Sequence, residues 1–144
     1  MIGIGSDHGG FELKNKVKEY LKSRGYDVKD YGAYTPNSVD YPDIARAVCT
    51  GVTSGQCECA ILVCGTGIGI SIAANKIKGI RCALCADSYS AKMTKCHNDA
   101  NVIALGGRVI GEEVAYDIVQ SYLDAQFMGE RHQVRVQKIM DLEK

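Results

Sequence analysis

The sequence has little that would mark a membrane protein or a nucleic-acid-binding protein. No apolar run approaches the roughly 20 residues that a membrane span needs, and the N-terminal MIGIGSDHGG lacks the basic start and long apolar stretch of a signal peptide. Lys and Arg (17) balance Asp and Glu (17), so the chain has no bulk positive field, although a local basic cluster could hold a small anion. We therefore expect a cytoplasmic protein with no nucleic-acid or membrane partner.

The chain has only 2 prolines, whereas its 16 glycines suit many tight turns. Its 7 cysteines are odd in number, and several lie in apolar settings such as IRCALCA, so a disulfide framework is not expected. A zinc site would recruit the cysteine pairs at 57/59 and 82/85 together with Cys96 and His97. Their spacing is imperfect, and two of these groups fall within expected strands, where alternate side chains point to opposite faces. Most of the cysteines are interpreted as small buried hydrophobic residues.

Short apolar runs alternate with helical patterns along the whole chain. Strands are expected at 1–5, 26–30, 59–64, 80–86 and 101–105, and helices at 11–24, 43–53, 88–96, 111–123 and 132–142. A further, small-residue helix is expected to follow the glycine run at 65–69 and to end near residue 76. This alternation predicts one α/β domain over residues 1–144, a Rossmann-like five-stranded parallel sheet with helices on both faces. The tail at 128–144 lies beyond the last sheet element, and we expect its helix to pack on a partner subunit.

Residues that can do chemistry follow the expected strands. The first strand is followed by Ser-Asp-His-Gly-Gly, the third by Cys-Gly-Thr-Gly-Ile-Gly and the fifth by Gly-Gly-Arg, and the helix after the fourth closes with His-Asn-Asp. Parallel sheets bind ligands at the carboxyl ends of their strands, so we expect all four groups at one edge. No dinucleotide fingerprint or P-loop is present, and no arginine completes a phosphatase-type loop after Cys64.

Cys64 is expected between a buried strand and the N-terminus of a helix, where free amides and the helix dipole favour a thiolate or a substrate oxyanion. The alternative is that Cys64 is simply the last apolar residue of its strand. Arg131 and Arg135 lie four residues apart on one face of the tail helix and suit a phosphate. Their alternative is a solvated helix face.

Six motifs together resemble a known family: SDHGG near the start, DYPD at 40–43, CGTGIGISIAANK at 64–76, IRCALC at 80–85, HNDANVIALGGRVIG at 97–111 and GERHQVRV at 129–136. In order and spacing they are similar to the type B ribose-5-phosphate isomerases over essentially the full length. The wider group also holds galactose-6-phosphate isomerase subunits and an allose-6-phosphate isomerase. The resemblance implies interconversion of D-ribose 5-phosphate and D-ribulose 5-phosphate through a cis-enediolate, in the non-oxidative branch of the pentose phosphate pathway. It also implies no metal or organic cofactor, and a homodimer or dimer of dimers with shared active sites.

The resemblance further implies roles for individual residues. Cys64 moves the carbon-bound proton, and Ile70 stands where some members carry a carboxylate instead. Thr66 and the amides around it hold the enediolate oxygens, while His97 opens the sugar ring with Asp7 as its partner. The expected substrate-binding residues are Asp7, His8, Tyr41, Gly65, Thr66, Gly67, Ile68, Gly69, Ser71, Asn98 and Arg108, together with Arg131 and Arg135 lent by the partner subunit.

Several of these residues could instead have purely structural roles: Asp7 as a helix cap, Tyr41 as packing for a turn, and Ser71 hydrogen-bonded to its own backbone. No role is expected for His132. For the whole chain, the alternatives are an isomerase of allose 6-phosphate or galactose 6-phosphate, or a sugar-phosphate-binding domain without catalysis. Base, acid and arginines on one chain favour the pentose enzyme, because the galactose enzymes pair two different subunits and a mere binder needs neither base nor acid.

Overall fold

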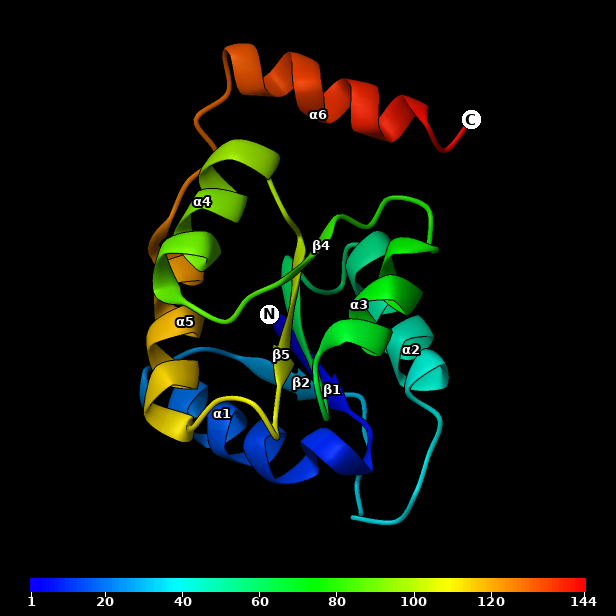
Figure 1. Cartoon of the computed structure of the whole chain (residues 1–144), viewed down its shortest axis with the longest axis vertical. Coiled ribbons are helices and arrows are strands. Elements are labelled where there is room, and N and C mark those ends of the chain that lie inside the picture. Colours follow the sequence, from blue (N-terminus) through cyan, green and yellow to red (C-terminus); the bar gives the residue numbers. More distant parts are fainter.

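The computed structural model describes all 144 residues, arranged around one five-stranded sheet (Figure 1). The strand order is β2-β1-β3-β5-β4, and every neighbouring pair is parallel. The strands are β1 (Ile2–Ser6), β2 (Val28–Asp30), β3 (Cys59–Cys64), β4 (Cys82–Leu84) and β5 (Val102–Gly106). The three central strands are almost wholly buried, as expected of a parallel sheet covered on both faces. The predicted α/β architecture is confirmed.

Helices cover both faces of this sheet (Figure 1). On one face α1, α4 and α5 pack against one core cluster, and on the other α2 and α3 pack against a second. Side chains of β3 alternate between the two: Ile61 and Val63 join the first cluster, whereas Leu62 and Cys64 join the second. The helices are the short 3-10 turn η1 (His8–Gly10), α1 (Phe11–Ser23), α2 (Tyr41–Thr53), α3 (Ile68–Asn75), α4 (Ser88–Asn98), α5 (Glu112–Asp124) and α6 (Arg131–Asp141).

The last helix, α6, lies outside these layers and crosses the end of the molecule at which β5 begins (Figure 1). Only two of its side chains, His132 and Val136, are buried, and the helix packs against α4. Near its end, the Glu143 carboxylate accepts a hydrogen bond from the backbone N–H of Gly79 (2.9 Å). Val134, Ile139 and Leu142 are exposed, with 84% of the Leu142 surface accessible. No helix of the chain combines the length and the apolar character needed to cross a membrane.

Candidate active site

Three loops meet at the carboxyl edge of the sheet, where β1, β3 and β5 end. The N–H of Gly107 donates to the carbonyl of Cys64 (2.8 Å), and the N–H of Arg108 donates to that of Gly65 (2.9 Å). The first loop packs equally closely, since a Cβ atom placed on Gly9 would lie 3.0 Å from the backbone nitrogen of Gly65. The floor of this edge is therefore made of main chain in contact with main chain.

Cys64 ends β3 with its side chain almost fully buried. Its Sγ accepts a hydrogen bond from the N–H of Gly67 (3.1 Å), the residue that precedes α3. Gly67 has φ = +80°, and a Cβ atom there would come within 2.6 Å of Leu84 Cδ1, so only glycine fits this turn. The turn points the amide of Gly67, just before the start of α3, at the sulfur, where it stabilises negative charge on a thiolate or on a nearby substrate oxygen.

Thr66 and Ser71 line the same turn but differ in their freedom to bind a ligand. Thr66 is exposed, and its Oγ1 accepts a hydrogen bond from the N–H of Ile68 (3.1 Å), which leaves its hydroxyl hydrogen free to donate. The hydroxyl of Ser71 donates to the carbonyl of Ile68 (2.7 Å), the bond to its own helix that was the alternative for this residue. Ile68 itself is half exposed on the first turn of α3.

The loop after β1 brings two further predicted residues to this edge. The carboxylate of Asp7 is buried and accepts a hydrogen bond from the N–H of Gly10 (3.1 Å), so it caps the turn η1. His8 is exposed, and its Nδ1 accepts from the N–H of Val39 (3.4 Å). Beside them is Ser6, which the sequence analysis did not single out: its hydroxyl is buried and has no hydrogen-bond partner. A small hydroxyl residue at the end of a central strand was the only signal for it.

Tyr41 and Arg108 both lie against glycines of the loop that follows β3. A Cβ atom on Gly69 would lie 2.7 Å from the Tyr41 hydroxyl, so that hydroxyl rests over the first turn of α3. A Cβ atom on Gly65 would lie 3.1 Å from Arg108 Nη1, so the guanidinium lies over the glycine loop. The absence of side chains at both glycines makes room for these two polar groups, as the predicted grouping requires.

The structure does not bring His97 and Asn98 to this edge, so the prediction of one common edge is wrong for them. α4 starts beyond the carboxyl end of β4 and runs back, and its last residues lie beside the amino ends of the strands. There the Asn98 carbonyl accepts from Nε of Arg81 (3.1 Å), the residue just before β4. The six residues of β3 place the two edges roughly 16–20 Å apart. The reason is topological, since these residues end a helix and not a strand.

A second group of polar side chains, the amino-edge cluster, comprises His97, His132, Arg131 and Arg135. The imidazole rings of His97 and His132 are stacked, with centroids 4.3 Å apart and planes within 8°. Arg131 and Arg135 are exposed on α6, one turn apart. Burial, the neighbouring His97 and the two arginines lower the pKa of His132. The cluster therefore combines an exposed positive surface with a buried imidazole that resists protonation.

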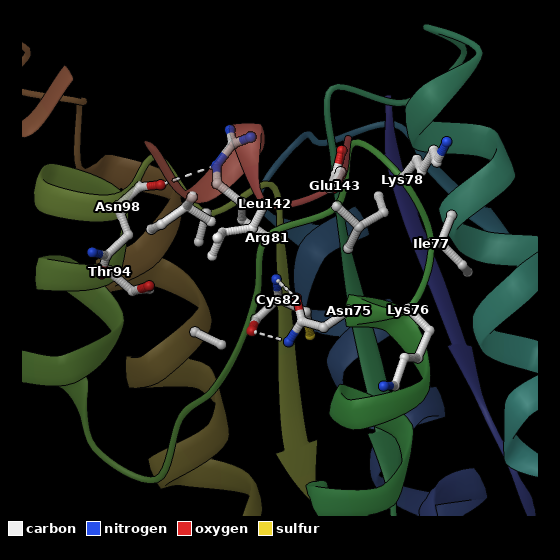
Figure 2. Close-up of a pocket in the computed structure, with 14 residues that line it drawn as sticks. Asn75, Lys76, Ile77, Lys78, Arg81, Cys82, Thr94, Asn98, Leu142 and Glu143 are labelled. Atoms are coloured by element: carbon white, nitrogen blue, oxygen red, sulfur yellow. Dashed lines mark hydrogen bonds between the residues drawn. The ribbon is translucent and has the colours of Figure 1, made fainter. Parts of the chain in front are cut away.

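A cavity of about 620 Å³ opens beside the amino-edge cluster, between α3, β4, α4 and the end of the chain (Figure 2). The side chain of Asn75 spans it by bonding both backbone groups of Cys82 at 2.8 Å. Arg81, Asn98, Leu142 and Glu143 also line it. The carboxyl edge with its thiol lies outside this hollow. No three His, Cys, Asp or Glu side chains lie close enough together to hold a metal ion, and all seven cysteines are free.

The sheet is parallel, its central strand ends in a thiol that accepts a hydrogen bond from the amide before α3, and glycine loops follow three neighbouring strands. This arrangement defines an enzyme-like site for a small oxygen-rich ligand. The chain belongs to the Ribose/Galactose Isomerase family, whose model matches residues 2–139.

Individual relatives resemble the chain over nearly its whole length. The solved structure of Clostridium thermocellum ribose-5-phosphate isomerase B is 55% identical, with a TM-score of 0.97, over 99% of this chain and 96% of that one. The ribose-5-phosphate isomerase B of Mycoplasma genitalium, solved with bound ribulose 5-phosphate, is 39% identical, with a TM-score of 0.94, over 99% and 95%. The D-erythrulose-4-phosphate isomerase of Pectobacterium atrosepticum is 45% identical over 96% of this chain and 91% of that protein.

Proposed function

We propose that the chain is an aldose–ketose isomerase that interconverts D-ribose 5-phosphate and D-ribulose 5-phosphate, with Cys64 as the carbon base. The observation that carries this proposal is the Cys64 thiol facing the N–H of Gly67 at the carboxyl edge. The thiolate takes the proton from C2 of the open-chain aldose, and the electrons of that C–H bond form a cis-enediolate. The proton of the C2 hydroxyl moves to O1, and the proton taken from C2 returns to C1. Thr66 and the amides of the glycine turn hold the two enediolate oxygens while negative charge is on them.

Ring opening needs a proton donor to the ring oxygen, and for this step we propose His97. A five-carbon chain spans only about 5 Å, whereas Cys64 and His97 of one chain lie at edges roughly 16–20 Å apart. One sugar therefore cannot touch both residues of the same chain. We propose that two copies assemble so that the amino-edge cluster of one faces the carboxyl edge of the other, with Asp7 assisting ring opening.

This assembly would also complete a phosphate site. His8 and Arg108 lie at the carboxyl edge, and Arg131 and Arg135 of the second copy would join them there. Apolar side chains left exposed next to that edge support a contact between copies: Ile68 (51%) and Ile72 (57%) on α3, and Leu84 (43%) on the edge strand β4.

Mixing two inactive variants tests the shared site directly. Cys64→Ala lacks the base and His97→Ala lacks the acid, and each alone is expected to be nearly inactive on ribose 5-phosphate. If sites are shared between two chains, co-refolding equal amounts gives mixed dimers that each carry one intact site, so about a quarter of wild-type activity returns. If each site used one chain only, mixing would restore nothing, and the shared-site proposal would be wrong.

The substrate is tested by isomerase assays on ribose 5-phosphate, allose 6-phosphate and galactose 6-phosphate, with wild type and Cys64→Ala side by side. Strong pentose turnover that the variant loses would support both the reaction and the base. Preference for a hexose phosphate would keep the mechanism and change the substrate. If no sugar were turned over and no substrate hydrogen exchanged with heavy water, the chain would be interpreted as a sugar-phosphate-binding domain without catalysis.

D-erythrulose 4-phosphate is a second candidate substrate, favoured by the 45% identical relative that bears the name of its isomerase. The same enediolate chemistry serves a four-carbon sugar, so this compound belongs in the assay series. Turnover of the tetrose well above that of the pentose would replace ribose 5-phosphate in the proposal.

A further inference from the structure

The imidazole rings of His97 and His132 stack on each other in the amino-edge cluster. His97 lies in the last turn of α4 and is half buried, whereas His132 lies in the first turn of α6 and is 7% exposed. Apart from Val136, His132 is the only buried residue of α6. The ring of His132 is therefore both an anchor of that helix and the surface against which the His97 ring lies.

The surroundings of His132 oppose a positive charge on its ring. His97 faces it from α4, and Arg131 and Arg135 flank it on its own helix, while the negative charge of Glu130, just before α6, acts in the opposite direction. Its Nε2 is enclosed and has no hydrogen-bond partner, so a protonated ring would bury an unpaired charged N–H there. The enclosed, unpartnered nitrogen and the lowered pKa both favour the neutral form of His132.

We propose that His132 is a positioning residue for ring opening, whose neutral ring fixes the plane of His97 and lets that ring carry the proton. The inference rests on the ring-opening role of His97 proposed above. Stacking restricts rotation of the His97 side chain, so its proton-bearing nitrogen keeps one direction relative to the sugar.

The chemistry of ring opening explains why the stacking partner should be neutral. The imidazolium of His97 gives its proton to the ring oxygen, the bond between that oxygen and C1 breaks, and the electrons of the C1 hydroxyl O–H bond form the carbonyl as its proton leaves to Asp7. His97 must be positively charged before this transfer. A second positive ring stacked on it would repel that charge, whereas a neutral ring tolerates it.

Two substitutions separate stacking from the rest of the side chain. His132→Ala removes the ring, and His132→Phe restores a planar ring without nitrogens. We expect His132→Ala to lower kcat on ribose 5-phosphate on the order of tenfold to hundredfold with little change in KM, and His132→Phe to recover most of that loss. Val134→Ala, an exposed change on the same helix, is the matched control and should behave as wild type.

A double-mutant cycle decides whether His132 acts through His97. If it does, adding His132→Ala to His97→Ala costs nothing further on ribose 5-phosphate, whereas independent losses that multiply would overturn the inference. D-erythrose 4-phosphate gives a second comparison, because its O4 carries the phosphate and cannot close a ring. Both histidine variants should then spare tetrose turnover, and equal losses on tetrose and pentose would point to a purely structural role.

The same experiments keep the two proposals apart. A wild-type protein without isomerase activity would end the proposed function itself. Activity that survives His97→Ala would remove the ring-opening role. A loss in His97→Ala that is absent in His132→Ala would overturn only the positioning role. In the folded variants, ring-current shifts of the His97 proton signals should disappear in His132→Ala and persist in His132→Phe.

Discussion

The two edges of the sheet differ in whether main-chain or side-chain groups form them. The carboxyl edge consists of glycine loops in main-chain contact, with a buried thiol at the end of β3. The amino edge carries its chemistry on side chains at the ends of α4 and α6, and much of it is exposed. The carboxyl edge is thus fixed by the core of its own chain, whereas the amino edge presents exposed side chains that are available to contact another molecule. Substitutions at the first should damage catalysis or folding, and those at the exposed arginines of the second, Arg131 and Arg135, should mainly weaken binding.

The largest effect is expected at the thiol of the carboxyl edge. Cys64→Ala removes the proposed base, and turnover should fall by about 10²–10⁴-fold because no neighbouring carboxylate replaces it. Binding of inorganic phosphate, measured by calorimetry, should remain close to that of wild type. Cys96→Ala, a buried cysteine on α4, is the control and should keep its activity. Near-normal turnover in Cys64→Ala would show that the base lies elsewhere.

The second largest effect is expected at the glycine turn below that thiol. Gly67→Ala forces a side chain into a backbone with φ = +80° and within 2.6 Å of Leu84 Cδ1. The free energy of unfolding should drop by about 1–3 kcal/mol, and kcat should fall with it as the amide turns away from Cys64. Gly111→Ser, where a Cβ atom meets nothing within 4 Å, should change neither quantity. If the two variants had the same free energy of unfolding in urea and the same kcat, the backbone conformation at Gly67 would not be what shapes this edge.

A buried ion pair beside the carboxyl edge makes its stability depend on pH. Lys14 Nζ donates to Asp30 Oδ2 (2.8 Å) and to the carbonyl of Ala33 (2.7 Å). Burial by itself would raise the pKa of Asp30, but hydrogen bonds from Lys14, Gly32 and Lys18 outweigh it and lower that pKa. The stabilisation is therefore present above the unfolded pKa near 3.9 and is lost as pH falls through the lower folded value.

Asp30→Asn tests this pair. At neutral pH it should cost about 1–3 kcal/mol of the free energy of unfolding, because Lys14 stays buried without its anion. Urea titrations at a series of pH values should show the difference from wild type shrinking below about pH 4. Asp117→Asn, an exposed change on α5, serves as the matched control. A difference that stayed constant with pH would mean that the charge of Asp30 contributes nothing.

The smallest effect is expected at the exposed amino edge. Arg135→Ala should raise KM for ribose 5-phosphate by about tenfold with kcat nearly unchanged, since it removes a proposed phosphate contact made equally in ground state and transition state. Lys138→Ala, also exposed on α6, should leave KM as it is. An unchanged KM in Arg135→Ala would mean that α6 does not reach a substrate.

The sequence was most informative where one pattern decides one structure. The run CAILVC was predicted as a strand at 59–64 and forms β3 over those residues, because a fully apolar run between turn signals fits the middle of a parallel sheet. The expected edge strand at 80–86 shrinks to Cys82–Leu84, since an edge strand has only one neighbour to extend it. The thiol and glycine loops were placed on the correct edge for the same topological reason.

What the sequence could not show depends on pairs of distant side chains. His132 was given no role, because nothing in a helical pattern indicates that a ring on α6 stacks on a ring of α4. His97 was expected beside Cys64 because its motif contains several polar residues, as the loops after the strands do. The helix after β4 runs antiparallel to that strand, however, so the end of the helix lies at the opposite edge of the sheet, and the motif does not show this. Such features are fixed by how elements pack, and a single chain pattern does not contain that information.

The main-chain character of the carboxyl edge has a consequence for sugar length. Amides are the same whichever side chains mutate, and under the proposed function they hold the two carbons that every aldose–ketose pair has in common. The phosphate lies at the far end of the sugar, where His8 and Arg108 of the same chain would receive it together with Arg131 and Arg135 of a second chain. The distance between the glycine turn and the phosphate-binding residues then determines how long a sugar the site accepts. A change from five carbons to four or six would then require a shift of these phosphate-binding residues, with the reacting end left untouched.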